Sequence, residues 1–315
     1  MRILVTGGAG FLGSHLCDLL VGRGDTVVCL DDLSSGRRAN LEHLISSRRF
    51  SFIEASVLDP INIVDSFDGV VHLASPASPP RYLKRPIFTL RTGSEGTRNV
   101  LEFARAKSAR FVLASTSEVY GEPLIHPQSE DYFGNVNPVG PRSVYDEAKR
   151  YAEALTTAYR TSCGTDTGIV RIFNTYGPRM RPDDGRVVST FIDQALRCAP
   201  LTVFGDGSQT RSLCYVGDSV RGIAAMLDSR EPGPINLGNP VEHSIRQIAE
   251  LVRELVGSPS KIELRPLPQD DPTRRKPDIT RARDRLSWSP RVQVREGFVR
   301  TIEWHQKALQ EVCAS

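Results

Sequence analysis

Short apolar segments alternate with helical patterns through the first half of the chain. Six segments have the length and apolar character of buried strands: residues 3–5, 26–30, 51–53, 70–73, 111–114 and 169–173. Helical patterns of apolar positions lie between them, at residues 11–23, 86–106 and 144–162. Strands that are apolar throughout and separated by helices are typical of a parallel sheet covered on both faces. The pattern therefore predicts an α/β fold with a doubly wound parallel sheet.

The second half of the chain is less regular and richer in turn residues. Proline and glycine gather at residues 176–178, at 205–207 and between 231 and 240. We expect a smaller C-terminal substrate lobe made of residues 174–211 and 238–315. The sheet domain then comprises residues 1–173, and segment 212–237 returns to it.

Composition and charge narrow the classes of function. The chain has 40 Lys and Arg residues against 37 Asp and Glu, and this surplus of +3 is too small to suggest a binder of nucleic-acid backbones. No run approaches the ~18 apolar residues that a bilayer span needs, and the first five residues form a strand pattern, not a signal peptide. The six cysteines are scattered, and the histidines show no metal spacing. We therefore expect a cytoplasmic protein with no metal site, no disulfides and no nucleic-acid or membrane partner.

A glycine-rich segment joins the first predicted strand to the first predicted helix. Gly7, Gly10 and Gly13 have the spacing Gly-x-x-Gly-x-x-Gly. Glycine permits a tight turn and lets the backbone approach a pyrophosphate, which then rests on the helix N-terminus. This segment therefore predicts a dinucleotide site at the start of the chain.

Charged residues after the second strand bear on which dinucleotide binds. The strand ends at Asp31, 18 residues after Gly13, and an acid there accepts from ribose hydroxyls and disfavours a 2′-phosphate. Arg37 and Arg38 would favour NADP, but we interpret them as the solvated start of a helix. The sequence therefore predicts NAD.

Tyr145 and Lys149 form a Tyr-x-x-x-Lys pair within the helical pattern 144–162. The i, i+4 spacing places the phenol and the ammonium on one face of the helix. A free phenol with a pKa near ~10 is a poor base at neutral pH, but a lysine cation and a positive nicotinamide both lower that pKa. Thr116 follows the fifth strand, so we expect its hydroxyl at the carboxyl edge of the sheet, where doubly wound sheets bind ligands.

Together these motifs resemble those of the extended short-chain dehydrogenase/reductase family, whose Rossmann-fold members act on nucleotide sugars. The resemblance runs across nearly the whole chain. It is carried by residues 6–13, 72–75, 115–121, 145–149 and 171–178. Further stretches are most similar to the UDP-glucuronate decarboxylases within that family: residues 74–80, 117–118, 126–130, 137–142, 184–189 and 274–278.

The resemblance implies NAD-dependent decarboxylation of UDP-glucuronate to UDP-xylose. Tyr145 would remove the proton of the sugar 4-hydroxyl while a hydride leaves C4 for NAD. The resulting β-keto acid would lose carbon dioxide, and the hydride would return to C4. The resemblance also implies a homodimer, with the helices near 88–106 and 144–162 in a shared bundle.

Individual residues receive roles through the same resemblance. The catalytic set is Thr116, Glu118, Tyr145, Lys149 and Arg275. The NAD-binding set is Gly7, Gly10, Phe11, Leu12, Gly13, Asp31, Ser35, Gly36, Ser56, Val57, Leu73, Ser75, Thr92, Tyr145, Lys149 and Thr175. The UDP-sugar set is Ser117, Glu118, Asn174, Arg179, Arg186, Arg211, Tyr215 and Arg275.

Ser117 and Glu118 bear on which reaction of the family is carried out. A 4,6-dehydratase carries Asp-Glu at these positions, and a serine hydroxyl is too weak an acid to protonate a departing 6-hydroxyl. Glu118 fits a place beside C5, managing the carboxylate or a water-mediated protonation. The planar guanidinium of Arg275 can donate two parallel hydrogen bonds to a carboxylate. Which of these roles belongs to Glu118 and which to Arg275 stays open. The alternatives are a nucleotide-sugar 4-epimerase, a 4,6-dehydratase-like enzyme and, with the least support, a non-catalytic NAD-binding regulator.

Three positions depart from the decarboxylase pattern, and one histidine calls for a structural interpretation. Ser56 stands where an Asp usually accepts from the adenine amine, so NAD affinity is expected to be lower. Arg91 replaces a usual Lys, and Gly93 replaces an Asn. His72 lies inside an apolar strand, where we expect a hydrogen-bonded structural residue.

Overall fold

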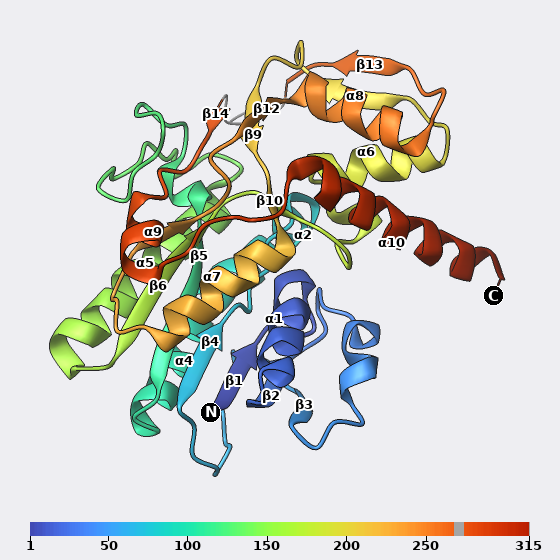
Figure 1. The fold of residues 1–315 in the computed structure, drawn as a ribbon. Helices are drawn as coiled ribbons and strands as arrows, with labels where there is room; N and C mark the ends of the chain where they lie inside the picture. Colours follow the sequence, from blue (N-terminus) through green and yellow to red (C-terminus); the bar gives the residue numbers. More distant parts are fainter. Residues whose placement is uncertain (268–273, 315) are drawn as a thin grey trace.

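The computed structural model describes residues 1–267 and 274–314. Its centre is a seven-stranded sheet in the order β11-β6-β5-β4-β1-β2-β3, in which every neighbouring pair is parallel (Figure 1). The strands are β1 (Arg2–Thr6), β2 (Thr26–Asp31), β3 (Phe50–Glu54), β4 (Gly69–His72), β5 (Arg110–Thr116), β6 (Thr167–Ile172) and β11 (Ile235–Leu237). The prediction of a doubly wound parallel sheet is confirmed.

Helices cover both faces of this sheet. One face carries α1 and α7, and the other carries α4 and α5. The helices are α1 (Phe11–Gly22), α4 (Thr97–Ala106), α5 (Ser143–Cys163) and α7 (Val216–Asp228). Successive side chains of β1 point to opposite faces, so Ile3 and Val5 join the first core and Leu4 joins the second. Burial on both faces explains why the strand segments show no polar alternation.

The helical pattern at residues 86–106 is divided into three elements. They are α3 (Pro86–Arg91), the π-helical segment η2 (Thr92–Gly96) and α4. Gly93 lies in η2 against α5, where an added Cβ would lie 2.6 Å from the Cβ of Ala148. The close approach of the two helices therefore explains why this position has no side chain. Segments of π-helix are frequent at functional sites.

A second core lies beyond the carboxyl edge of the sheet. It is formed by α6, α8, α10 and the paired strands β8 and β13 (Figure 1). The bounds are α6 (Val187–Leu196), β8 (Leu201–Phe204), α8 (Ile245–Val256), β13 (Ile262–Arg265) and α10 (Val294–Ala314). Helix α9 (Thr280–Leu286) instead packs on the sheet domain, where Ala282 and Trp288 join the core under α7. The domain boundaries drawn from the sequence stay a prediction.

Two short sheets connect the cores at this edge. β7 pairs with β10, and β9 lies between β12 and β14. The bounds are β7 (Thr175–Tyr176), β9 (Thr210–Ser212), β10 (Cys214–Tyr215), β12 (Glu242–Ser244) and β14 (Arg274–Arg275). The remaining short elements are η1 (Arg38–Leu44), α2 (Pro79–Lys84), η3 (Ser117–Tyr120) and η4 (Pro182–Asp184). Pairing of β14 with β9 places Arg275 opposite Arg211, although 64 positions (275 − 211) separate them in the sequence.

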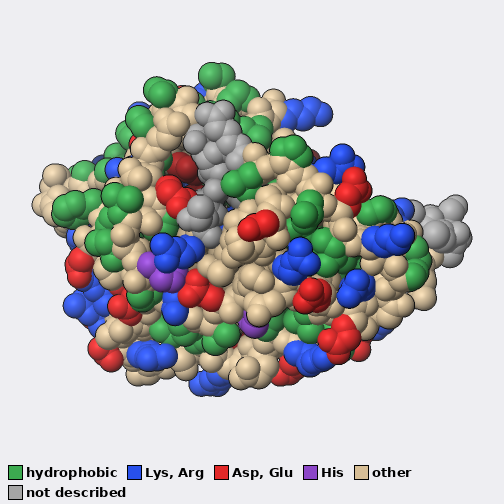
Figure 2. All heavy atoms as spheres, turned by 90° about the horizontal axis from the view of Figure 1, so that it is seen from above, with side chains coloured by type: hydrophobic (Ala, Val, Ile, Leu, Met, Phe, Trp, Pro, Cys, Tyr) green, Lys and Arg blue, Asp and Glu red, His purple; other side chains and the backbone are tan. Residues whose placement is uncertain are grey.

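The described residues can be compared with the expectations about surface charge, membrane-spanning helices and metal sites. On the face seen in Figure 2, the described Lys and Arg side chains are interspersed with Asp and Glu. Within the described ranges, no helix combines the length and apolar character that crossing a bilayer requires. The same ranges hold no group of three or more His, Cys, Asp or Glu side chains placed to bind a metal ion. His72 is a buried structural residue, as expected, with Nδ1 2.7 Å from the Thr6 hydroxyl and Nε2 3.2 Å from the Thr97 hydroxyl.

Candidate active site

A large cavity of about 650 Å³ opens at the carboxyl edge of the sheet, between the two cores. Residues at the ends of β2 and β5, together with the loops after β1, β4 and β6, form its wall. Every residue predicted to be catalytic lines it. Of the cofactor and substrate residues, Gly36, Ser56 and Tyr215 are not part of the wall. The structure therefore brings most of the predicted site into one place.

The three remaining residues have other contacts. Gly36 lies beside the carboxylate of Asp31, where an added Cβ would be 3.0 Å from Oδ1. The Ser56 hydroxyl accepts a hydrogen bond from the backbone N–H of Leu58 at 3.3 Å. The Tyr215 ring packs edge-on against another tyrosine ring and lies 5.6 Å from the guanidinium of Arg300. The structure does not bring Tyr215 to the cavity, because its ring is held between β7 and α10.

The glycine loop presents backbone to the cavity. Gly7 has a φ of +71°, and an added Cβ would lie 2.7 Å from the backbone nitrogen of Ala74. At Gly13 an added Cβ would collide with the carbonyl oxygen of Gly7, so α1 packs directly on the loop. No side chain caps the first turn of α1 at Gly10. Its N–H groups and the helix dipole therefore suit a pyrophosphate.

Polar groups around this loop fit the rest of a dinucleotide. The Asp31 carboxylate accepts from the backbone N–H groups of Ala9 and Leu33, both at 2.9 Å, and lines the cavity. Burial raises the pKa of this carboxyl, and the two backbone bonds oppose that rise. Among the described residues, the buried Ser75 hydroxyl has no hydrogen-bond partner and belongs to a cavity-wall residue. A ribose or amide group would satisfy it, so the residues present fit NAD.

The two arginines that follow Asp31 differ from each other in placement. Arg38 lies with its guanidinium 5.5 Å from the ring centroid of Phe52, on the surface. Arg37 is exposed directly before η1, in agreement with its interpretation as a solvated helix start, and it also belongs to the cavity wall. Burial and the nearby charge of Arg181 lower the pKa of Arg37.

Tyr145 lies in the first turn of α5, with its ring stacked on Tyr82. The two ring centroids are 5.2 Å apart and the planes differ by 6°. Burial raises the pKa of the Tyr145 phenol most strongly and the charge of Glu118 raises it further, whereas Arg186 and a hydrogen bond with Thr116 lower it. Burial and Glu118 outweigh the other two effects, so the pKa of the phenol is raised overall, although the phenol lies against one hydroxyl and near one cation.

Lys149 contacts the backbone of β5 instead of the phenol. Its Nζ donates to the carbonyl oxygen of Ala114 at 2.8 Å and lies 5.9 Å from the centroid of the Tyr145 ring. Burial lowers the pKa of Lys149 to about 8, with Glu153 opposing the change. Arg186 is a cation whose charge lowers the pKa of Tyr145, and the expected contribution of Lys149 stays a prediction.

Glu118 lies in η3, two residues after Thr116, and is held by two arginines. Its Oε2 accepts from Arg142 Nη2 at 2.7 Å and from Arg275 Nη2 at 3.2 Å. Burial raises the pKa of this carboxyl, but Arg275, Arg142 and Arg211 lower it to about 2. At neutral pH Glu118 is therefore a fixed negative charge, and this arrangement does not favour it as a proton donor.

Arg275 connects Glu118 to both ends of η3. Its side chain is 1% exposed, and Nη1 donates to the carbonyl oxygens of Ser117 and Gly121, both at 2.9 Å. Arg275 also belongs to the cavity wall, and the pairing of β14 with β9 places its backbone opposite Arg211, another wall residue. It therefore shapes the active-site turn as well as presenting positive charge.

The sequence matches the model of a known enzyme family. The model of the NAD dependent epimerase/dehydratase family matches residues 3–238, which is most of the chain. The chain belongs to this family. NAD is accordingly the cofactor, and the glycine loop, Asp31 and Ser75 stay the residues predicted to hold it.

Curated relatives and solved structures of the family cover nearly all of the chain. UDP-glucuronic acid decarboxylase 1 of Arabidopsis thaliana is 50% identical over 99% of this chain and 71% of the relative. The Xenopus tropicalis protein of the same name is 52% identical over 98% and 73%. UDP-glucuronic acid 4-epimerase from Bacillus cereus, solved with UDP-glucuronic acid and NAD, is 31% identical with a TM-score of 0.87, covering 98% of this chain and all of that one. UDP-glucose 4-epimerase from Thermotoga maritima has the same identity and coverage with a TM-score of 0.91.

Two residues of this family member's site did not emerge from its sequence. Arg142 lies three positions before Tyr145, which is about one helical turn. A single arginine at such a position is common, so the sequence alone did not identify it as part of the site. Tyr82 stacks on Tyr145 from α2, and no sequence pattern connects these two segments. Both line the cavity.

Asp146, next to Tyr145 on α5, supplies a pH-dependent test of this charge cluster. It is buried, and its Oδ1 has no hydrogen-bond partner among the described residues. Burial first, and then the charge of Glu118, raise its pKa from 3.8 to about 7. The folded protein therefore keeps this proton to a higher pH than the unfolded chain does. The stability that Asp146 contributes is present at low pH and is lost as the pH rises from 3.8 to about 7.

We expect Asp146→Asn, which cannot lose a proton, to gain stability relative to the wild type as the pH rises. The measurement is the free energy of unfolding of both proteins by denaturant at about pH 5 and about pH 8. A difference between the two proteins that is equal at both pH values would contradict the raised pKa.

Proposed function

We propose that the protein binds UDP-glucuronate together with NAD and decarboxylates it to UDP-xylose through a 4-keto intermediate. The observation that supports this proposal most strongly is the group of arginines in the cavity wall near Tyr145. There the Glu118 carboxylate accepts from Arg142 and Arg275, and the charge of Arg211 also lowers its pKa. Guanidinium groups gathered at one end of a cavity suit a sugar that bears a carboxylate as well as a diphosphate. The names of relatives at 50–52% identity support the same substrate.

The proposed roles at C4 follow from the placement of the phenol. When bound, NAD supplies the acceptor for the C4 hydride and returns it in the last step. Tyr145 accepts the proton of the 4-hydroxyl, and Thr116 holds the reacting oxygen through its hydroxyl. Arg186 stabilises the phenolate, because its charge favours the deprotonated form.

The proposed roles at C5 and C6 follow from the arginine cluster. Arg275 and its neighbours orient the sugar carboxylate, and the β-keto acid then loses carbon dioxide because the new carbonyl accepts the electron pair. Glu118 stays ionised between Arg142 and Arg275, so it orients the water that protonates C5 and does not itself supply the proton.

Incubation with UDP-glucuronate and NAD tests the proposal, with UDP-glucose as the control substrate because it lacks the carboxylate. We expect carbon dioxide and UDP-xylose from UDP-glucuronate, no carbon dioxide from UDP-glucose, and no net NADH at 340 nm. A product of unchanged mass would favour a 4-epimerase like the Bacillus cereus neighbour. Stoichiometric NADH would indicate an ordinary dehydrogenase.

We also propose a homodimer built on α3 and α5. These helices pack together and expose the apolar side chains Ile87, Leu90 and Tyr151, of which Ile87 is 69% exposed. Ile87→Glu is therefore expected to convert a dimer to a monomer in sedimentation velocity, because a charge would be buried in the interface. Ile45→Glu is the matched control, since Ile45 is an exposed isoleucine on another face. A wild-type monomer, or a variant that stays dimeric, would contradict the proposal.

We propose the cytoplasm as the location of the enzyme. The buried thiols of Cys17 and Cys29 lie together beneath Gly8 and are not joined by a disulfide. Free thiols at such positions are compatible with a reducing compartment.

A further inference from the structure

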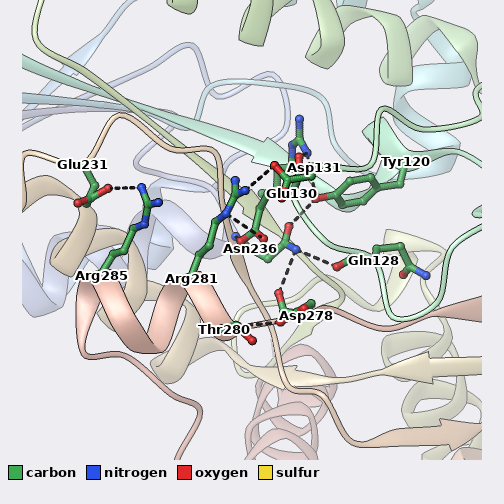
Figure 3. A network of polar contacts seen from close by, with 11 residues as sticks. Tyr120, Gln128, Glu130, Asp131, Glu231, Asn236, Asp278, Thr280, Arg281 and Arg285 are labelled. Atoms are coloured by element: carbon green, nitrogen blue, oxygen red, sulfur yellow. Dashed lines mark hydrogen bonds and ion pairs between the residues drawn. The ribbon is translucent and has the colours of Figure 1, made fainter.

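Asn236 lies at the centre of a network of polar contacts that includes Tyr120, Gln128 and Asp278 (Figure 3). Asn236 belongs to β11 and is fully buried. Its Oδ1 accepts from the Tyr120 hydroxyl at 2.8 Å, and its Nδ2 donates to the carbonyl oxygens of Gln128 at 3.0 Å and Asp278 at 3.1 Å. Both donor hydrogens and the acceptor of this amide are therefore in use.

The partners of Asn236 belong to the two segments that form the active-site ion pair. Tyr120 is the last residue of η3, which carries Glu118. Asp278 follows Arg275 by three residues. A single side chain on a strand of the central sheet thus fixes both segments to the same rigid support.

Gln128 makes the second set of connections to the Arg275 segment. Its Oε1 accepts from the backbone N–H of Lys276, and its own N–H donates to the Lys276 carbonyl, both at 2.8 Å. Its carbonyl oxygen accepts from the backbone N–H of Asp278, also at 2.8 Å. Gln128 is fully buried and thereby holds the chain immediately after Arg275 on both sides of Pro277.

We propose that Asn236, acting with Gln128, is a positioning residue that sets the geometry of Arg275 against Glu118 at the carboxylate end of the sugar. This rests on the proposed decarboxylation. Neither Asn236 nor Gln128 belongs to the wall of the cavity, so any effect on the reaction must pass through the residues they hold. Positional errors near 1 Å can cost on the order of 10² in rate, and the 3.2 Å contact between Arg275 and Glu118 is sensitive to such a shift.

Two near-isosteric variants and one control test the proposal. Asn236→Leu removes three hydrogen bonds and keeps the branched shape of the side chain, and Gln128→Met removes the acceptor for Lys276 N–H. Arg285→Ala is the control, because Arg285 lies at the outer end of the same network, where it pairs only with Glu231 among the contacts drawn in Figure 3. Single-turnover rates of carbon dioxide release and of C4 oxidation, observed as NADH, are measured for each protein with UDP-glucuronate.

We expect both variants to slow carbon dioxide release by ~10- to 100-fold while C4 oxidation changes by less than about threefold. Arg285→Ala should leave both rates unchanged. Equal losses in the two rates would indicate general damage to the fold and would overturn the positioning role. If Asn236→Leu does not fold, because its former hydrogen-bond partners are left buried and unpaired, the measurement on Gln128→Met alone decides the proposal.

A double-variant comparison identifies the residue through which Asn236 acts. In an Arg275→Ala background, Asn236→Leu should add little further loss of carbon dioxide release, because the two changes affect one interaction. If the double variant lost carbon dioxide release by the product of the two single-variant factors, the proposal would be overturned. Carbon dioxide release by the wild type establishes the proposed function separately. A wild type that releases none would refute that function, whereas variants that match an active wild type would refute only the positioning role.

Discussion

Tyr145→Phe is expected to lower the turnover of UDP-glucuronate by ~10²–10⁴-fold, the usual loss when a general base is removed. The change keeps the aromatic ring, so the stack on Tyr82 remains, but it deletes the oxygen that bonds Thr116 and takes up the proton. NAD and UDP affinities, measured by calorimetry, should stay near those of the wild type, because the glycine loop and the arginines are untouched.

Tyr159→Phe is the matched control for this variant. Tyr159 lies on the same helix, α5, and its hydroxyl donates to Glu102 at the protein surface, far from the cavity. We expect normal turnover from it. Near-normal turnover from Tyr145→Phe as well would show that Tyr145 is not the base.

Arg275→Ala is expected to reduce carbon dioxide release by ~10²-fold or more, since positioned charges contribute on this scale. Oxidation at C4 should fall by less than about tenfold, because Thr116 and Tyr145 supply that chemistry. The same separation is expected for Glu118→Gln, which keeps the shape of the side chain but removes the charge that holds Arg142 and Arg275.

Single-turnover NADH formation measured beside carbon dioxide release separates the two steps. Arg274→Ala is the control, because it truncates the neighbouring arginine of β14, which is exposed. If Arg275→Ala released carbon dioxide at the wild-type rate, the assignment of this residue to the carboxylate would be wrong. A 4-epimerase reaction would then become the stronger hypothesis.

The central sheet could be predicted from the sequence because burial on both faces leaves a strong local signal. All seven strands of the sheet correspond to apolar segments. The seventh, β11, lies in segment 212–237, which the sequence predicted to return to the sheet domain. The division of residues 86–106 could not be predicted, because apolar periodicity hardly changes when a helix widens into η2. Close packing of Gly93 on Ala148 is a tertiary contact without a local pattern.

The candidate site was predictable where a residue acts through its own motif. The glycine loop, Asp31 and the pair of Tyr145 and Lys149 all reach the cavity. The partners of these residues were not predictable, because charge pairing depends on which segments the fold brings together. Lys149 bonds the carbonyl of Ala114 only because β5 lies under α5.

The arginine cluster illustrates the same limit. The sequence indicated Glu118 and Arg275 through resemblance alone, but not that Arg142 would share the carboxylate and keep it ionised. The proposed role of Glu118 as a fixed charge, instead of a proton donor, therefore rests on the folded geometry and not on the sequence. Asn236 and Gln128 were equally hidden, because nothing local distinguishes a buried amide that supports an active site from one that supports a core.

The fate of a deuterium atom at C4 of UDP-glucuronate tests the central claim most directly. The account predicts that UDP-glucuronate labelled with deuterium at C4 gives UDP-xylose that has lost carbon dioxide and still carries the label, as measured by mass spectrometry. Retention follows because the hydride removed from C4 returns to the same carbon. A labelled product of unchanged mass, or an oxidised product without the label, would contradict the account.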